Sequence, residues 1–311
     1  MAIFQLGPII KARREELGLS QEDLADGICS VPTLSRIENG ERMPTKNHFE
    51  MLMQRLGYSA MSLDFFTDRQ DFRIHELKIR LRYAYISRET VLVKHYLEEL
   101  EHLVVNPTKI DEQFLVLYQT LLGKNQYTNG ERLKRFEEAL KLTCCGYDVG
   151  KIPHVLSYEE IILLNNIAIC YATDNDHDYA IFILYKLKEY YEHNMISKDE
   201  ALRTQPMVLY NLSKSLGLSG RYDECIETCD SGIRIAVTSG RCPKLGVTLF
   251  NKAWALLQRN KTGDRENAML SLKRAYSFAE AMDDQREMDY LRKFFVDHFG
   301  EELNTKPPYN L

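Results

Sequence analysis

Residues 20–40 read Ser-Gln-Glu-Asp-Leu-Ala-Asp-Gly-Ile-Cys-Ser-Val-Pro-Thr-Leu-Ser-Arg-Ile-Glu-Asn-Gly and predict two short helices joined by a tight turn. Ser20 can cap the first helix, with Asp23 as its reciprocal partner three residues on. Ser30 can cap the second helix, and Gly40 can end it in the left-handed conformation. The plainer alternative is an ordinary helical hairpin, but the coincidence of caps and stop favours a helix-turn-helix.

The apolar residues of this stretch support the same interpretation. Leu24 and Ala25 face inward, and the small side chain of Ala25 allows a second helix to cross closely. Leu34 and Ile37 form an apolar stripe of three-residue spacing on the second helix. Residues 31–39 therefore correspond to the helix that such a module offers to the major groove.

The flanking sequence predicts two further helices. Apolar residues recur at helical spacing on both sides of the motif, at Leu6, Ile9, Ile10 and Leu17 before it and at Phe49, Leu52, Met53 and Leu56 after it. Gly18 ends the first of these helices and Thr45 caps the second. Residues 1–66 then form a compact module of four or five helices. The motifs L-G-L-S-Q-E-D-L-A and L-S-R-I-E-N-G resemble the Cro/C1 (XRE) type of DNA-binding domain, and G-I-C-S-V-P-T-L-S-R-I-E-N-G looks most like the PlcR type of regulator.

This resemblance implies a set of DNA contacts. Its groove-facing, phosphate-facing and flanking positions correspond to Gln21, Ser30, Val31, Pro32, Thr33, Arg36, Asn39 and Arg42. Arg36 is the candidate for a bidentate guanine contact, although it could instead pair with Glu38. Val31 and Pro32 are apolar and could contact a thymine methyl group.

Composition places the chain among globular proteins. Its 311 residues are 44% hydrophobic and 27% charged, and no apolar run approaches the roughly 18 residues that a membrane span needs. The first residues show no basic segment before the apolar ones, so no secretory signal is expected and a cytoplasmic protein is predicted. The net charge is −5, so DNA binding would depend on where the basic residues lie and not on a generally basic surface.

Metal and catalytic chemistry find little support in the sequence. The seven cysteines include no C-x-x-C pair; Cys144 and Cys145 are adjacent, and Cys225 and Cys229 lie four residues apart. Reduced, buried thiols are expected, with a zinc site or redox switch as the alternative. The sequence has no G-x-S-x-G, H-E-x-x-H or Walker motif, and His177 lies in a polar loop. We therefore expect no enzyme active site, no metal and no cofactor.

The remainder of the chain indicates helical repeats. We predict a connector helix within residues 67–88 and repeats over residues 89–311. Residues 164–171, 209–216 and 249–256 align, each with a small residue where its two helices meet, and weaker copies occupy residues 82–105 and 114–142. The small residues are Ala168, Ser213 and Ala253 in the first helices and Ala180, Cys225 and Ala268 in the second. The segment L-Y-N-L-S-K-S-L-G-L-S-G-R-Y-D-E-C-I resembles a tetratricopeptide repeat.

Asparagine recurs at one position of these repeats, as Asn166, Asn211 and Asn251. Because asparagine is a mediocre helix former, three equivalent copies need a reason. Its amide both donates and accepts, so it could clamp the backbone of an extended peptide; the alternative is a hydrogen bond between neighbouring helices. Further candidates for peptide binding are Lys214 for a carboxylate, Trp254 for an apolar side chain, and Tyr118 and Tyr210.

The two parts together resemble the Rap/Rgg/NprR/PlcR/PrgX group of peptide-responsive regulators. The resemblance implies an all-α protein, with a Cro/C1-type helix-turn-helix domain followed by a right-handed superhelix of about five tetratricopeptide-like hairpins. It also implies a transcription regulator of the quorum-sensing type that acts as a homodimer, binds operator DNA, and responds to a short signalling peptide in the concave groove of its repeats. The alternatives are a constitutive regulator, or a modulator of a partner protein, whose repeats serve only protein–protein contacts.

Overall fold

The computed structural model describes residues 6–56, 69–144, 156–192, 198–240, 242, 244–301 and 303. Within these residues the regular structure is α-helix, with one 3-10 turn and no strand. The all-α prediction is therefore confirmed. The chain divides into two compact units, one of Met1–Asp174 with Glu189–Glu200 and the other of Asn175–Lys188 with Ala201–Leu311.

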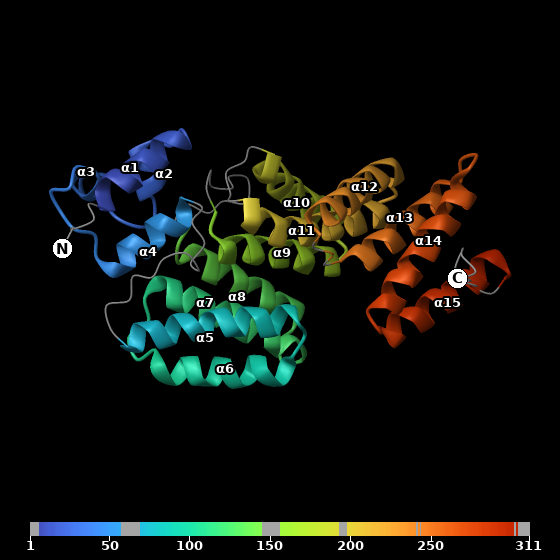
Figure 1. Cartoon of the computed structure of the whole chain (residues 1–311), viewed down its shortest axis with the longest axis horizontal. Coiled ribbons are helices and arrows are strands. Elements are labelled where there is room, and N and C mark those ends of the chain that lie inside the picture. Colours follow the sequence, from blue (N-terminus) through green and yellow to red (C-terminus); the bar gives the residue numbers. More distant parts are fainter. Residues whose placement is uncertain are drawn as a thin grey trace, which may run out of the picture. The chain divides into compact units, whose positions relative to one another are not determined.

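The first unit begins with a cluster of four helices (Figure 1), namely α1 (Leu6–Glu16), α2 (Gln21–Ala25), α3 (Val31–Glu38) and α4 (Lys46–Arg55). They enclose a common apolar core that contains Ile10, Leu19, Leu24, Ala25, Leu34, Ile37, Phe49, Leu52, Met53 and Leu56. The predicted inward faces of these helices are thus confirmed. The side chains of Leu6 and Ile9 lie outside the described residues.

The caps that the sequence predicts are formed. Asp23 N–H donates to Ser20 Oγ at 3.0 Å, and Ser20 N–H donates to the Asp23 carboxylate at 3.0 Å, which completes a capping box. Ser30 Oγ accepts from Thr33 N–H at 3.3 Å at the start of α3. Beyond α3, Gly40 has φ +73°, a conformation that glycine adopts without strain.

Gly7 sets how closely α1 approaches α3. A Cβ atom at this position would lie 1.9 Å from the carbonyl oxygen of Ile37, far inside van der Waals contact. The two helices therefore meet backbone to backbone, and only glycine fits at the crossing. This contact fixes the orientation of α3 relative to α1.

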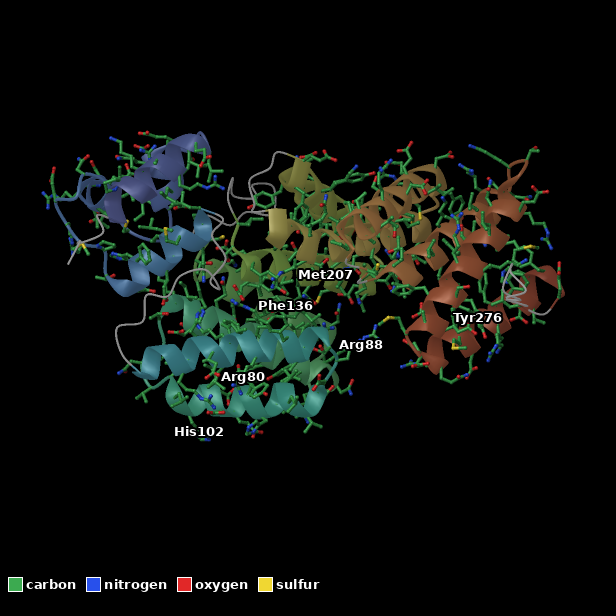
Figure 2. The ribbon with its side chains drawn as sticks, viewed as in Figure 1. Arg80, Arg88, His102, Phe136, Met207 and Tyr276 are labelled. Atoms are coloured by element: carbon green, nitrogen blue, oxygen red, sulfur yellow. The ribbon has the colours of Figure 1, made fainter. Side chains whose placement is uncertain are left out.

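The first unit continues with five helices, which are α5 (Arg69–Ile86), α6 (Thr90–Leu103), α7 (Lys109–Leu122), α8 (Asn129–Lys141) and α9 (Tyr158–Thr173). Helix α5 packs against α6, α7 against α8, and α8 against α9; Figure 1 shows α5 to α8 side by side. Phe136 of α8, labelled in Figure 2, is fully buried in this packing. A 3-10 turn, η2 (Gly123–Asn125), follows α7.

The basic residues of α5 form ion pairs within the first unit. Arg73 pairs with Glu99 at 2.6 Å, Lys78 with Asp111 at 2.5 Å and Arg82 with Glu159 at 2.5 Å. The more exposed Arg80, labelled in Figure 2, pairs with Glu76. The pairs of Arg73, Lys78 and Arg82 therefore join α5 to α6, α7 and α9, whereas the Arg80 pair lies within α5.

The second unit contains the remaining helices, although two of them, α10 (His177–Glu192) and α11 (Lys198–Leu218), each have a few residues in the first unit. The other four are α12 (Tyr222–Ser239), α13 (Leu245–Arg259), α14 (Asp264–Ala281) and α15 (Gln285–Phe299). Within this unit α12 packs against α13, α13 against α14, and α14 against α15. The small residues predicted at helix crossings have no exposed surface; they are Ala168, Ala180, Ser213, Cys225, Ala253 and Ala268. Helices α5 to α14 follow one another as five successive pairs, in agreement with the prediction of about five hairpins, and α15 comes after them. Helix α5, the first of these, lies within the residues that the sequence predicts as a connector.

Two further points concern the limits of the domains. The predicted boundary near residue 66 lies in residues 57–68, outside the described residues, and the predicted limits 1–66, 67–88 and 89–311 stay predictions. Among the helices that are described, none is long and apolar enough to cross a membrane.

Candidate functional site

Four of the eight predicted DNA-contacting residues lie on α3, and Ser30 and Asn39 flank this helix. Of the eight, Ser30, Pro32, Arg36, Asn39 and Arg42 are exposed, and Gln21, Val31 and Thr33 are half-buried. Arg36 and Arg42 form no ion pair within the described part of the chain. Both guanidinium groups are therefore available to a partner.

A buried polar network lies behind α3. Arg14 of α1 donates two hydrogen bonds to the Glu38 carboxylate, at 2.6 and 2.9 Å, and a third to the Leu19 carbonyl at 2.9 Å. Gln21 donates its side-chain amide to the same carboxylate at 2.7 Å. Because Glu38 is fully engaged by Arg14 and Gln21, it is not the partner of Arg36, which stays on the surface.

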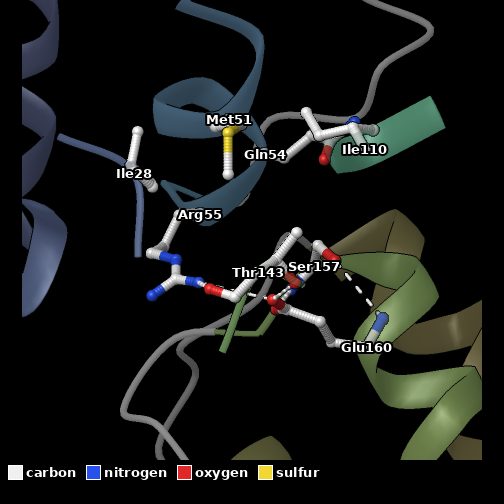
Figure 3. A pocket seen from close by; sticks show the side chains of 8 residues that line it. All are labelled: Ile28, Met51, Gln54, Arg55, Ile110, Thr143, Ser157 and Glu160. Carbon is white, nitrogen blue, oxygen red and sulfur yellow. Dashed lines mark hydrogen bonds and ion pairs between the residues drawn. The ribbon is translucent and has the colours of Figure 1, made fainter. Parts of the chain in front are cut away.

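A second buried network joins α4 to α9 within the first unit (Figure 3). The Arg55 guanidinium donates to the carbonyl oxygens of Asp26 and Thr143 at 3.2 and 3.1 Å and to the Glu160 carboxylate at 3.3 Å. Thr143 Oγ1 donates to the same carboxylate at 2.6 Å. Arg55 and Glu160 are 4% and 1% exposed, so these opposite charges form an ion pair in a region with little access to water.

The electrostatics of this network favour an ionised Glu160. Burial alone would raise the pKa of its carboxyl group, but the Arg55 charge and hydrogen bonds from Thr143 and Ser157 outweigh burial and lower it. The pKa of the neighbouring Cys144 thiol is raised, by burial first and then by the Glu160 charge. Cys144 is therefore a protonated, structural thiol. Sequence reasoning missed this network, although S-Y-E-E at residues 157–160 is a readable capping box.

The three predicted asparagines have different surroundings. Asn166, in the first unit, is 8% exposed and donates to the Ile162 carbonyl of its own helix at 2.8 Å. Asn251, in the second unit, donates to Ser213 Oγ at 3.0 Å and so links α13 to α11. Asn211 is half-buried on α11. The contact of Asn251 corresponds to the alternative of a bond between helices, and a role in clamping a peptide stays a prediction for all three.

The other peptide-binding candidates divide between surface and core. Lys214 is exposed, and Tyr210 lies under the Lys244 ammonium group, 5.6 Å from its ring centre. Half-buried Trp254 packs edge-on against Tyr222, with ring centres 6.0 Å apart. Tyr118, in the first unit, is 2% exposed and belongs to the core.

No cluster of three or more His, Cys, Asp or Glu side chains suited to a metal ion occurs among the described residues. Cys225 and Cys229 are free and fully buried on α12. Cys145 lies outside the described residues.

Two family models match this sequence. A helix-turn-helix model matches residues 10–62, and the model described as the RNPP family C-terminal domain matches residues 93–288. A search of curated proteins gave no match.

The fold is similar to that of three solved structures. Bacillus thuringiensis PlcR in complex with the peptide PapR7 and DNA has a TM-score of 0.60 and 19% identity, over 92% of this chain and 98% of that one. Its apo form has a TM-score of 0.56 and 18% identity, over 94% and 98%. ComR from S. thermophilus, in complex with DNA and its signalling peptide ComS, has a TM-score of 0.51 and 16% identity, over 94% and 98%. Since residues 93–288 make up more than half of the sequence, this protein belongs to the RNPP family.

Proposed function

We propose that this chain is a sequence-specific DNA-binding transcription regulator controlled by a short signalling peptide that its helical repeats bind. The observation that carries the proposal is the exposed Arg36 on a capped α3 whose backbone is fixed by Gly7, followed by an RNPP C-terminal domain. The PlcR and ComR structures with this fold contain DNA and a peptide. The proposal assigns the chain no catalytic step.

In the DNA complex α3 lies in the major groove. Arg36 donates two guanidinium N–H groups to O6 and N7 of one guanine, and exposed Pro32 contacts a thymine methyl group. Arg42 and Ser30 contact phosphate and fix the register of the protein on the duplex. Because one such module buries little DNA, two copies of the chain read two half-sites as a homodimer.

Operator selection tests the DNA-binding part of the proposal. The full chain is incubated with random-sequence duplexes, and bound duplexes are enriched, sequenced and footprinted. We expect two inverted half-sites with a recurring guanine, and sedimentation of a two-to-one protein–duplex complex. Enrichment of no sequence above the starting pool contradicts the proposal.

Peptide control is tested on the selected operator. A pool of short synthetic peptides is screened for binding to the full chain, and each bound peptide is then added to the operator titration. We expect at least one peptide to change operator affinity. Operator binding that no bound peptide changes would favour the constitutive regulator whose repeats serve only protein contacts.

A further inference from the structure

Arg132 of α8 is a buried arginine that has no anionic partner in the part of the chain that the structure describes. It is 9% exposed, its Nε atom is buried without a hydrogen-bond partner, and it forms no ion pair within the described residues. Its guanidinium carbon lies 5.7 Å from the centre of the Phe136 ring, one turn further along α8. A buried guanidinium normally has a carboxylate or phosphate beside it, because desolvation of the charge is costly.

The other buried arginines of the described residues show the usual arrangement. Arg14 pairs with Glu38, and Arg55 pairs with Glu160. Arg132 alone of the three lacks such a partner. The exception is therefore local to α8 and not a general property of this protein's interior.

A second unsatisfied polar atom lies on the same face of α8. The side-chain oxygen of Asn129, one turn before Arg132, is buried and accepts no hydrogen bond. The nitrogen of the same amide donates to the Cys170 carbonyl of α9 at 2.8 Å, so this side chain is held in place. Asn129 and Arg132 thus place an unsatisfied acceptor and an unsatisfied donor on one face of α8.

The Arg132 charge acts on two buried groups, one on α5 and one on α9. Burial raises the pKa of the Tyr85 phenol, and the Arg132 charge opposes this rise. Burial also raises the pKa of the Cys170 thiol to about 11, again opposed by Arg132. Asp174 and Glu137 act on Cys170 in the other direction, and neither reaches Arg132 as an ion pair.

We propose that Arg132 and the side-chain oxygen of Asn129 bind the C-terminal unit of a peptide, with its free carboxylate on the guanidinium. The planar guanidinium fork matches a carboxylate with parallel hydrogen bonds. The asparagine oxygen needs a donor, and the last peptide unit carries an N–H next to its carboxylate. Inorganic phosphate lacks this N–H and could meet the asparagine oxygen only through a protonated P–O–H group. This inference rests on the proposed function, because it names the end of the signalling peptide that the first unit recognises.

Small mimics of a peptide terminus test the site without knowledge of the peptide. N-acetyl-leucine carries the carboxylate and the adjacent N–H, and N-acetyl-leucinamide keeps the N–H but lacks the charge. Each is titrated into the full chain at constant ionic strength while the Nε–H signal of Arg132 is followed by NMR and the unfolding midpoint by calorimetry. We expect the acid to bind at least about tenfold more tightly than the amide, and to raise the midpoint.

Three variants sharpen the test. Arg132→Met removes the unpaired charge at similar length, so it should unfold at or above the wild-type midpoint without ligand and bind acid and amide alike. Asn129→Asp supplies Arg132 with an internal carboxylate, so it should also lose the preference for the acid. Arg135→Met is the matched control, since Arg135 lies on the same helix but already donates to Thr120 Oγ1 at 2.9 Å, and it should keep the preference.

Several results would overturn the inference. They are equal binding of acid and amide by the wild type, a preference that survives in Arg132→Met, a lower midpoint of unliganded Arg132→Met, or tighter binding of inorganic phosphate than of the acid. The proposed function fails differently, through a lack of operator selection or of peptide control. A peptide that controls operator binding equally well with an amidated C-terminus would contradict this inference and leave the proposed function standing.

Discussion

The helix-turn-helix module and the α5–α9 part of the first unit treat a buried arginine in opposite ways. In the module, Arg14 donates to the Glu38 carboxylate and to the Leu19 carbonyl, and Gln21 donates to the same carboxylate. In α8, Arg132 contacts an aromatic ring, and no described carboxylate pairs with it. The Arg14 charge is therefore compensated by a carboxylate of the same module, whereas the Arg132 Nε atom of α8 is left without an acceptor.

The difference suggests a division of labour. A recognition helix benefits from rigid support, because it must present its side chains to DNA without rearrangement. A domain that responds to a ligand benefits from a polar group that lacks a partner in the unliganded state, because a ligand that pairs with this group then stabilises the bound state relative to the free one. The following predictions test both halves of this comparison.

The largest effect is expected for Glu38→Ala. This change leaves the Arg14 guanidinium buried without its partner, so the free energy of unfolding of the module should fall by about 3–5 kcal/mol. Urea unfolding of the full chain, followed by a probe placed in the module, measures it. Glu41→Ala, on the exposed turn after α3, is the control and should change the value by less than about 0.5 kcal/mol. A loss for Glu38→Ala no larger than that of the control would mean that the module does not depend on this pair.

The second-largest effect is expected for operator binding by α3, the helix that the Arg14–Glu38 network supports. Arg36→Ala should weaken binding to the selected operator by about 1–3 kcal/mol and relax the preference for guanine at one position. Its unfolding should match that of the wild type, because Arg36 is exposed and unpaired among the described residues. Arg42→Ala is the comparison, since loss of a phosphate contact weakens all sequences alike and lowers the salt dependence. Unaltered operator affinity of Arg36→Ala, with the fold intact, contradicts the assignment.

A pH dependence is expected from the network between α4 and α9. Because the pKa of Glu160 is lowered by Arg55 in the folded state, its contribution is complete above the ordinary glutamate pKa and is lost as the pH falls below that value. The loss is at most about 1.4 kcal/mol per pH unit. Urea unfolding of the wild type between about pH 6 and pH 3.5 should show a steeper fall than that of Glu160→Gln. Exposed Glu112 provides the control, and the unfolding free energy of Glu112→Gln should depend on pH as that of the wild type does. An equal pH dependence in all three proteins would mean that Glu160 does not contribute to it.

The smallest effects separate two of the asparagines. Asn251→Ala removes the hydrogen bond to Ser213 and should lower the free energy of unfolding by about 0.5–1.5 kcal/mol, with or without peptide. If Asn211 clamps the peptide backbone, Asn211→Ala should weaken peptide binding by a similar amount. Calorimetry on both variants, with exposed Asn267→Ala as control, distinguishes these roles. An Asn211→Ala protein that binds peptide as the wild type does would retire the clamp at that residue.

Local sequence rules predicted the helix-turn-helix in detail, because its determinants act within four residues. The Ser20–Asp23 box, the Ser30 cap and the stop at Gly40 are all of this kind. The small residues of the repeats, such as Ser213 and Ala253, could be predicted because a small residue recurs at the helix crossing in each copy of the repeat.

Contacts between residues far apart in the chain could not be read in this way. Arg55 and Glu160 are separated by 105 positions, and nothing local distinguishes Arg55 from an ordinary surface arginine at a helix end. Arg132 escaped notice because its distinction is a missing partner, which only the packing of α8 and α9 reveals. The alternative that Arg36 pairs with Glu38 was decided by Arg14, a residue on another helix.

The close crossing at Gly7 has a consequence for how this sequence can vary. Tolerance of substitution usually follows the burial of a side chain, but Gly7 has no side chain to bury, and the nearest obstacle is the Ile37 carbonyl of another helix. A scan of all amino acids should therefore find position 7 as intolerant as Leu34, while the exposed neighbour Pro8 accepts many replacements. The same crossing couples sequence changes in α1 to changes in the orientation of α3. New operator preferences can arise by exchange of residues on the outer face of α3, whereas a new tilt of α3 would require a coordinated change at position 7.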